Sequence, residues 1–374
     1  MMGRRAWLAI FAATVLASSA CADLFGFHEL REGDSGKDVN VPDTGADVDT
    51  CPHERWPDPP STGSGTSKSY TMAIRHVFFT TTPDGGAATF GYDLDSRCTT
   101  DPSSASCKAA AVTVDGPGGV DNGSIGLMST VVGLGVTDSL KDESINQIID
   151  SGAFTMLVRV FNLQNDTNQT AGVINVAIQS SPALVTSPPT WDGGDRWYPA
   201  VDDVVGGDAG TNTPNHLMPG YVTNGVLVAK DTTPLALALY LPPGNTPSGP
   251  LHVKLINPVI TARLVKRGDG NYDLADGVIA GRWAASDMLR TVADLTINGS
   301  SLCTYIGGSA YQVVQQKICD ARDITASNVD NNSENCDALS VAVAFDAVAA
   351  QVGNSPVGFP VSQTPCGDAA LCGD

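Results

Sequence analysis

The sequence predicts a mainly β protein, a β-sandwich of the jelly-roll or lectin-like kind with a disulfide-stapled helical C-terminal part. One observation is the acidic composition, because only five of the 40 acidic residues are Glu and the rest are Asp. Asp favours turns and caps, whereas Glu favours helices. A second is a series of short apolar segments with period-2 alternation, separated by turn residues. The third is that Cys303, Cys319 and Cys336 flank C-terminal segments with a helical period.

The first elements follow from periodicity and stop signals. Residues 70–80 and 111–114 are predicted strands, and residues 140–151 form a predicted helix with Asp138 or Ser139 as its N-cap. Gly152 ends that helix. Residues 154–163 are apolar on both faces, which indicates a central strand, and residues 172–179 alternate as a half-buried strand does.

A hairpin and three further segments complete the β part. Asn224 and Gly225 stand between two apolar runs in residues 221–229, which is a strong signal for a two-residue turn. Residues 235–241, 251–256 and 259–265 continue the alternation. After Trp283 the pattern becomes helical, with helices predicted over residues 286–295, 309–319 and 336–352. The last has an apolar stripe and ends at Gly353.

The first twenty residues have the features of a secretory leader. Arg4 and Arg5 precede a twelve-residue apolar run, which is followed by Ser18-Ser19-Ala20-Cys21. The run is too short to span a bilayer, which takes about 20 residues. Cys21 with its small preceding residues resembles the lipidated cysteine of bacterial lipoproteins, although Ser18 stands where Leu is usual. Ordinary cleavage after Ala20 is the alternative.

The cysteine count agrees with lipidation. The chain has nine cysteines, and lipid on Cys21 would leave an even set of eight for disulfides in an oxidising compartment. We expect Cys98–Cys107 and Cys366–Cys372 to be local pairs. The complete set of disulfide candidates is Cys51, Cys98, Cys107, Cys303, Cys319, Cys336, Cys366 and Cys372.

These features divide the chain into four predicted parts. Residues 1–20 are the signal peptide, and residues 21–69 are a lipid-anchored, acidic, disordered tether without a sustained apolar period. Residues 70–283 are the β-sandwich domain. Residues 284–374 are the helical C-terminal part, packed on the sandwich.

An acidic constellation predicts a calcium site. Clustered carboxylates with nearby glycines, which let backbone carbonyls turn inward, suit a hard cation such as Ca²⁺. The alternative is that these are turn residues of surface loops. The candidate metal ligands are Asp93, Asp95, Asp115, Asp121 and Asn122.

The segments around these acids carry a second resemblance. GYDLD at residues 91–95 and DGPGGVDN at residues 115–122, after an acidic tether, resemble uncharacterised envelope lipoproteins of myxobacterial-type bacteria. The resemblance implies a location and not an activity.

One loop is rich in aromatic residues and predicts a ligand-binding face for sugars. Aromatic rings flanked by carboxylates are the means by which lectin-like sites hold carbohydrate. The alternative is that the aromatics cover the core. The candidate residues are Trp191, Asp192, Asp195, Trp197 and Tyr198.

Charge and motifs limit the function. A net charge of −19 argues against a nucleic-acid partner, which needs clustered basic residues. We therefore expect a non-enzymatic cell-envelope lipoprotein, a surface binding or structural module. Its expected partners are the membrane, through the lipid anchor, and a glycan or an envelope protein. Ala22 follows Cys21 where inner-membrane lipoproteins often carry Asp, which favours the outer membrane or cell surface over a freely periplasmic or secreted protein. The alternative is a secreted hydrolase with an Asp/His site near His216.

Overall fold

The structure, a computed structural model, describes most of the chain after residue 50. The described residues are 51–63, 65–79, 90–111, 113–127, 141–186, 188–207, 212–241, 249–297, 300–303, 309–327, 332–359 and 372. The predicted signal peptide, Cys21 and Cys366 lie outside them.

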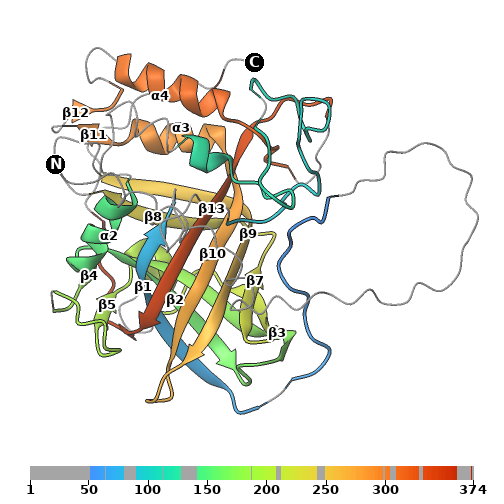
Figure 1. Cartoon of the computed structure of the whole chain (residues 1–374). Coiled ribbons are helices and arrows are strands. Elements are labelled where there is room, and N and C mark those ends of the chain that lie inside the picture. Colours follow the sequence, from blue (N-terminus) through green and yellow to red (C-terminus); the bar gives the residue numbers. More distant parts are fainter. Residues whose placement is uncertain are drawn as a thin grey trace, which may run out of the picture. The chain divides into compact units, whose positions relative to one another are not determined.

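One large antiparallel sheet dominates the described residues (Figure 1). Its nine strands run in the order β10-β13-β1-β2-β3-β6-β7-β9-β8. Their bounds are β1 Lys68–Phe78, β2 Thr155–Leu163, β3 Gln169–Ser181, β6 Met218–Thr223, β7 Val226–Lys230, β8 Leu235–Leu241, β9 Gly249–Lys266, β10 Tyr272–Ala284 and β13 Ala338–Ala349.

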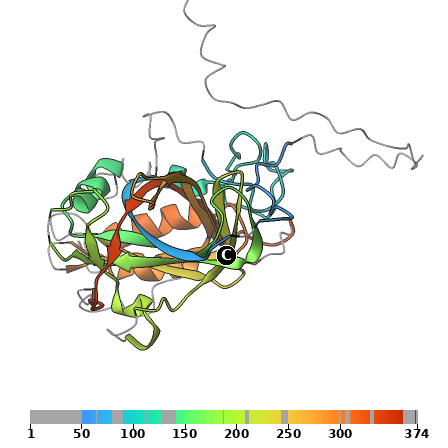
Figure 2. The same cartoon turned by 90° about the horizontal axis from the view of Figure 1, so that it is seen from below.

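The sheet closes on itself through β9. Residues 259–263 of β9 pair with β7 on one side, and the same strand pairs with β10 on the other. Eight of the nine strands therefore form a closed ring, which is visible end-on in Figure 2. The ninth, β8, pairs with residues 249–255 of β9 and extends the wall at one end.

Small elements surround this sheet. The helices with described bounds are α2 (Asp142–Asp150), α3 (Ala285–Ala293) and α4 (Ser309–Asp320), with 3₁₀ turns η2 (Val201–Asp203) and η3 (Val205–Gly207). Residues 123–127 are also helical. The short strands are β4 (Ala183–Leu184), β5 (Arg196–Tyr198), β11 (Thr296–Ile297), β12 (Ser300–Ser301) and β14 (Gln351–Val352). Helices α3 and α4 lie together at one end of the closed sheet (Figure 1).

The mainly β class is confirmed, and so is the predicted hairpin. Strands β6 and β7 pair up to Thr223 and Val226, with Asn224 and Gly225 between them at φ values of 51° and 81°. Both residues adopt the left-handed conformation that the tightest hairpin turn requires. The two-layer sandwich is not confirmed, because strand pairing continues through all nine strands of the one sheet.

The segment 336–352, where the sequence predicted a helix, instead contains the strand β13, Ala338–Ala349. Strand β13 lies in the sheet between β10 and β1. Its inward residues include Leu339 and Phe345, and its outward residues include Ala342, which is also fully buried. A strand buried on both faces is a continuous apolar run, and such a run also contains an apolar stripe at helical spacing.

The other helix predictions are confirmed in place. Helices α2, α3 and α4 occupy the predicted segments. Helix α2 follows Lys141, which makes no side-chain cap, while Asp138 and Ser139 lie outside the described residues. The predicted strand over residues 111–114 is wrong at its described residues, because this stretch belongs to a loop in which Asp115 N donates to Thr99 O.

The disulfides are long-range. The structure pairs Cys51 with Cys98, Cys107 with Cys336 and Cys319 with Cys372, and Cys303 is also disulfide-bonded. The predicted local pairs, Cys98–Cys107 and Cys366–Cys372, are therefore wrong. The fold brings Cys98, Cys107 and Cys372 next to cysteines that are distant in the sequence and not next to their neighbours along the chain.

Two of the three predicted boundaries between the parts of the chain move. Trp56 packs edge-on against Tyr92 with ring centroids 5.7 Å apart, and the Tyr221 hydroxyl donates to Pro57 O at 2.5 Å. Residues 51–63 therefore belong to the folded unit and not to a disordered tether. At the other end, β13 lies inside the sheet, so residues 338–349 belong to the β part and not to a helical C-terminal part.

Candidate functional site

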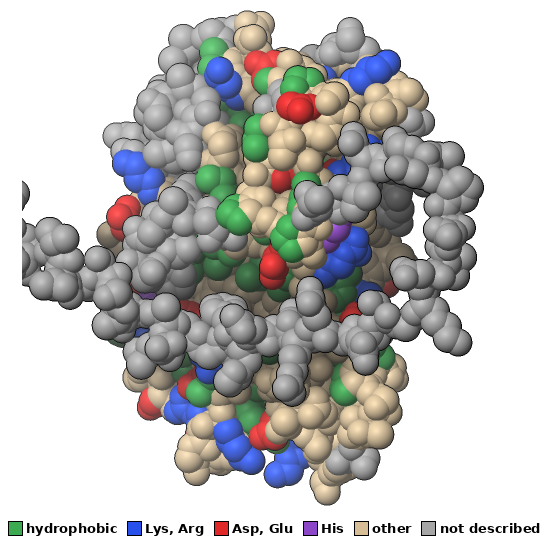
Figure 3. Space-filling model, turned by 45° about the vertical axis from the view of Figure 1, so that its right-hand side comes forward, with side chains coloured by type: hydrophobic (Ala, Val, Ile, Leu, Met, Phe, Trp, Pro, Cys, Tyr) green, Lys and Arg blue, Asp and Glu red, His purple; other side chains and the backbone are tan. Residues whose placement is uncertain are grey.

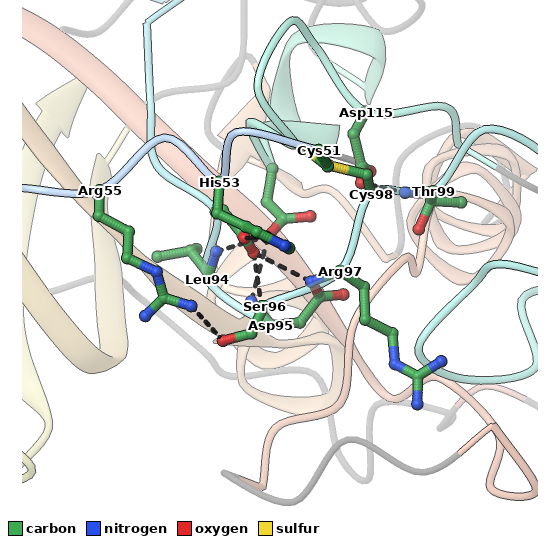
Figure 4. Close-up of polar contacts among 12 residues, drawn as sticks. Cys51, His53, Arg55, Leu94, Asp95, Ser96, Arg97, Cys98, Thr99 and Asp115 are labelled. Carbon is green, nitrogen blue, oxygen red and sulfur yellow. Dashed lines mark hydrogen bonds and ion pairs between the residues drawn. A yellow bond between two sulfur atoms is a disulfide. The ribbon is translucent and has the colours of Figure 1, made fainter. Parts of the chain in front are cut away.

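The predicted calcium ligands come from two loops that the fold brings together. Tyr92 and Asp121 form an isolated β-bridge, with Asp121 N donating to Tyr92 O at 3.0 Å. As a result, carboxylate oxygens of Asp93, Asp95 and Asp121, one from each residue, lie within 4.8 Å of one another. All three side chains are buried. We call Asp93, Asp95, Asp115 and Asp121 the acidic cluster. Figure 4 labels Asp95 and Asp115 of this cluster together with the neighbouring His53.

Backbone amides and one histidine orient the acidic cluster. Leu94 N donates to Asp121 Oδ2 at 2.6 Å, and Ser96 N donates to Asp93 Oδ1 at 2.5 Å. The His53 ring Nδ1 lies 2.5 Å from Asp93 Oδ2. These contacts hold the carboxylates in place and supply part of the polar environment that buried charge needs.

Asn122, the fifth predicted ligand, is hydrogen-bonded to its surroundings through both atoms of its side-chain amide. Its Nδ2 donates to Phe90 O at 3.1 Å and to Ala342 O at 3.4 Å. Its Oδ1 accepts from Ala342 N at 3.2 Å and from the Ser124 hydroxyl at 2.6 Å. The hydrogen bonds of Asn122 to Ala342 therefore hold the loop that contains Asp121 against β13.

The electrostatics of the acidic cluster favour neutral or cation-bound carboxylates. Burial, and then the neighbouring Asp95, raise the pKa of Asp121 well above its usual value. Burial raises the pKa of Asp115 to about 7, with further contributions from the carboxylates of Asp95 and Asp323. Several carboxylates at this separation repel one another when ionised, and a hard divalent cation with oxygen ligands would remove that repulsion.

Asp323 is a neighbour of the cluster that the sequence did not indicate. It is held by Ser340, whose N donates to Asp323 Oδ1 at 2.8 Å. Burial raises the pKa of Asp323 to about 6. The residue lies about two hundred positions after the others, and no local pattern in the sequence links it to them; in the structure the Cys107–Cys336 disulfide joins these two parts of the chain.

The aromatic loop covers part of the core, and it buries Trp197, one of the residues of the predicted sugar-binding face. Trp197 is completely buried and packs with Ala73, Leu157 and Leu184. Trp191 is half-buried, and its ring centroid lies 5.8 Å from that of Trp197. Since neither face of Trp197 is open to solvent, a sugar cannot stack on it.

The remaining residues of this loop support its fold. The buried Asp195 accepts hydrogen bonds from Thr190 N at 3.0 Å and from Trp191 N at 2.6 Å. The exposed Asp192 accepts from Gly194 N at 2.8 Å. Half-buried Tyr198 pairs with Ala183 in the small sheet. The loop is therefore a structural cap.

His216 is paired with a carboxylate. Its Nε2 lies 3.0 Å from Asp231 Oδ2, and both side chains are largely buried. Asp231 Oδ1 accepts from Thr232 N at 2.7 Å. Within the described part of the chain, no hydroxyl or thiol is hydrogen-bonded to His216, so this His–Asp pair has no nucleophile there.

An apolar cavity of about 140 Å³ lies at the end of the sheet next to α3 and α4. Strands β8, β9, β10 and β13 and both helices contribute its walls. Ser124 is the one polar residue among the nineteen described residues that line it. The period-2 pattern indicated which residues face inward, but not that the space between them is incompletely filled.

Comparisons with protein families, with curated proteins and with solved structures find no match for this chain. In the described parts of the chain, no helix is both long and apolar enough to cross a membrane. Acidic, basic and hydrophobic side chains are interspersed over the described part of the face drawn in Figure 3.

Proposed function

We propose that this chain is a cell-envelope lipoprotein whose folded part is a non-enzymatic binding or structural module. The observation that carries the proposal is the leader, residues 1–20, followed directly by Cys21. The lipid on Cys21 would hold the module at the outer membrane or cell surface, and its partners there would be the membrane and envelope components.

The state of the cysteines supports an oxidising location. Seven of the eight cysteines that follow Cys21 are disulfide-bonded, and the eighth, Cys366, lies outside the described residues. Disulfides persist in exported proteins and are rare in the cytosol. A protein in that environment also meets Ca²⁺ at concentrations at which weak sites fill, with Kd on the order of 10⁻⁴–10⁻³ M.

Detergent phase partitioning tests the anchor. We expect the wild-type chain, expressed in a bacterium, to enter the detergent phase and Cys21→Ala to stay in the aqueous phase. Ser18→Leu is the matched control, since it brings the leader closer to the lipoprotein pattern and should preserve partitioning. An aqueous wild-type protein would contradict the proposal.

We also propose that the acidic cluster binds Ca²⁺ and thereby stabilises the module. The residues fit a hard cation because the three closest carboxylates converge within 4.8 Å and are buried. The bound ion would compensate the charge of Asp93, Asp95 and Asp121, with Asp115 nearby.

A secreted hydrolase is the second candidate, favoured by the 3.0 Å contact between His216 and Asp231. If the chain is a hydrolase, the folded wild-type protein should hydrolyse an ester substrate. His216→Ala should abolish that activity. The aromatic loop does not support a glycan as partner, since Trp197 is buried.

A further inference from the structure

The described residues that line the cavity at the helix-capped end of the sheet are apolar except for Ser124. Strand residues Leu237, Val253 and Val341 face it from the walls, and Met288 of α3 and Ile318 of α4 face it from the cap. Each of these side chains is at least nine-tenths buried. Protein interiors are normally filled to crystal-like density, so an unfilled space of this size among buried side chains is a departure from ordinary packing.

The fold keeps this cavity open. Strand β8 lies against β3 at this end, where Ala238 N donates to the Ser180 hydroxyl at 2.9 Å. Helix α4 is fastened by the disulfide between Cys319 and Cys372. The walls are therefore held by strand pairing and the cap by a covalent bond, which oppose collapse of the helices into the space.

The size and polarity of the cavity define the ligand class. An apolar cavity of about 150 Å³ stays dry and takes up benzene, so about 140 Å³ accommodates roughly six carbon atoms. No charged residue is among the described lining residues. An ionised carboxylate would lose its hydration there without compensation, which excludes a charged group inside the cavity.

One lining residue has an unused hydrogen-bond donor. The Trp283 indole N–H is buried and has no acceptor among the described residues. Buried indole N–H groups usually find a partner, and an unpaired one costs free energy. An oxygen atom on the ligand would satisfy it.

We propose that this cavity binds an uncharged acyl-chain-like ligand, with a chain of about six carbons inside and one oxygen accepting from Trp283. The proposal deepens the proposed binding function by naming its ligand class. It does not depend on the lipid anchor, because it concerns the folded unit alone.

The test uses the full chain carrying Cys21→Ala, which removes the need for detergent that would compete for the cavity. Methyl hexanoate, benzene and the hexanoate anion at pH 7.5 are titrated separately by calorimetry. We expect saturable one-to-one binding of methyl hexanoate and benzene and none of hexanoate. An absence of saturable methyl hexanoate binding overturns the proposal, while the partitioning of the wild-type chain tests the anchor separately.

Two substitutions locate the site. Val253→Phe fills the cavity and should abolish binding of both neutral probes, whereas the matched control Val114→Phe, at a residue 61% exposed, should leave binding unchanged. Val292→Phe on α3 is a second filling variant if Val253→Phe does not fold. Unchanged binding in a folded filling variant would show that the probes bind elsewhere and would contradict the proposal.

Trp283→Phe tests the hydrogen bond. It keeps an aromatic ring but removes the N–H donor, so methyl hexanoate should bind about tenfold more weakly, while benzene should change less than about twofold. Equal weakening of both probes would mean that the ring and not the donor matters, and the assigned oxygen contact would be wrong.

Discussion

At the scale of single residues, the backbone of Gly277 packs so closely against the ring of Phe345 that no side chain fits between them. A Cβ placed on it would lie 2.5 Å from the ring of Phe345 on β13. Gly277→Ala should therefore lower the free energy of unfolding by about 1–3 kcal/mol, as overpacking of a core does. Urea denaturation measures the change. Gly268→Ala is the control, since no atom lies within 4 Å of its Cβ position, and an equal loss in both variants would contradict this explanation.

Asp203 makes stability depend on pH. Burial raises its pKa from 3.8 to about 6 in the folded protein. The folded state then binds more protons than the unfolded state between these values, so the Asp203 contribution is present below about pH 4 and lost as the pH rises through 6. Asp203→Asn should reduce the fall of the melting temperature between pH 4 and 6, and Asp115 and Asp323, whose pKa values are also raised, should keep the rest. An unchanged pH profile would show that another group is responsible.

The acidic cluster should couple stability to Ca²⁺. Binding to the native state alone adds about 2.7 kcal/mol at a hundredfold excess of ligand over Kd. Chelation should therefore lower the melting temperature, and Ca²⁺ should restore it more fully than Mg²⁺. Asp93→Asn with Asp121→Asn should remove the response, while exposed Asp192→Asn should keep it. A melting curve indifferent to the chelator would leave these residues as structural turn carboxylates.

At the scale of elements, the sequence predicted the position of most strands and helices but not the type of residues 336–352. The hairpin at Asn224–Gly225 was predictable because its turn chemistry is local. Strand β13 was not, because its apolar residues pack on both faces and the alternating signal disappears. Asp93 and Asp121 of the acidic cluster were predictable because they stand in short segments with other carboxylates and nearby glycines. Their neighbour Asp323 was not, since only the fold brings it close.

The disulfide between Cys319 and Cys372 should stabilise the cap. It closes a loop of 53 residues, for which the chain-entropy relation gives about 4 kcal/mol. Cys319→Ser with Cys372→Ser should lower the free energy of unfolding by that order. The exchange rate of the backbone amide hydrogens should rise first in α4. A uniform rise across the large sheet, with no excess in α4, would contradict a local role for this bond.

At the scale of the whole molecule, the closed sheet could not be predicted from local patterns. Closure depends on β9 pairing with both β7 and β10, and pairing between strands is a long-range property. The mainly β class and the disulfides followed from composition and cysteine count. The cavity followed from neither, because its volume is what remains after packing, and periodicity identifies only which side chains face inward.

The mass of the N-terminal peptide of the membrane-purified protein tests the envelope-lipoprotein proposal most directly. We predict a peptide that begins at Cys21 and carries the added mass of a diacylglycerol group. The result follows if residues 1–20 are removed and the Cys21 thiol is lipidated. A peptide with an unmodified Cys21 thiol, or one that still begins at Met1, would contradict it.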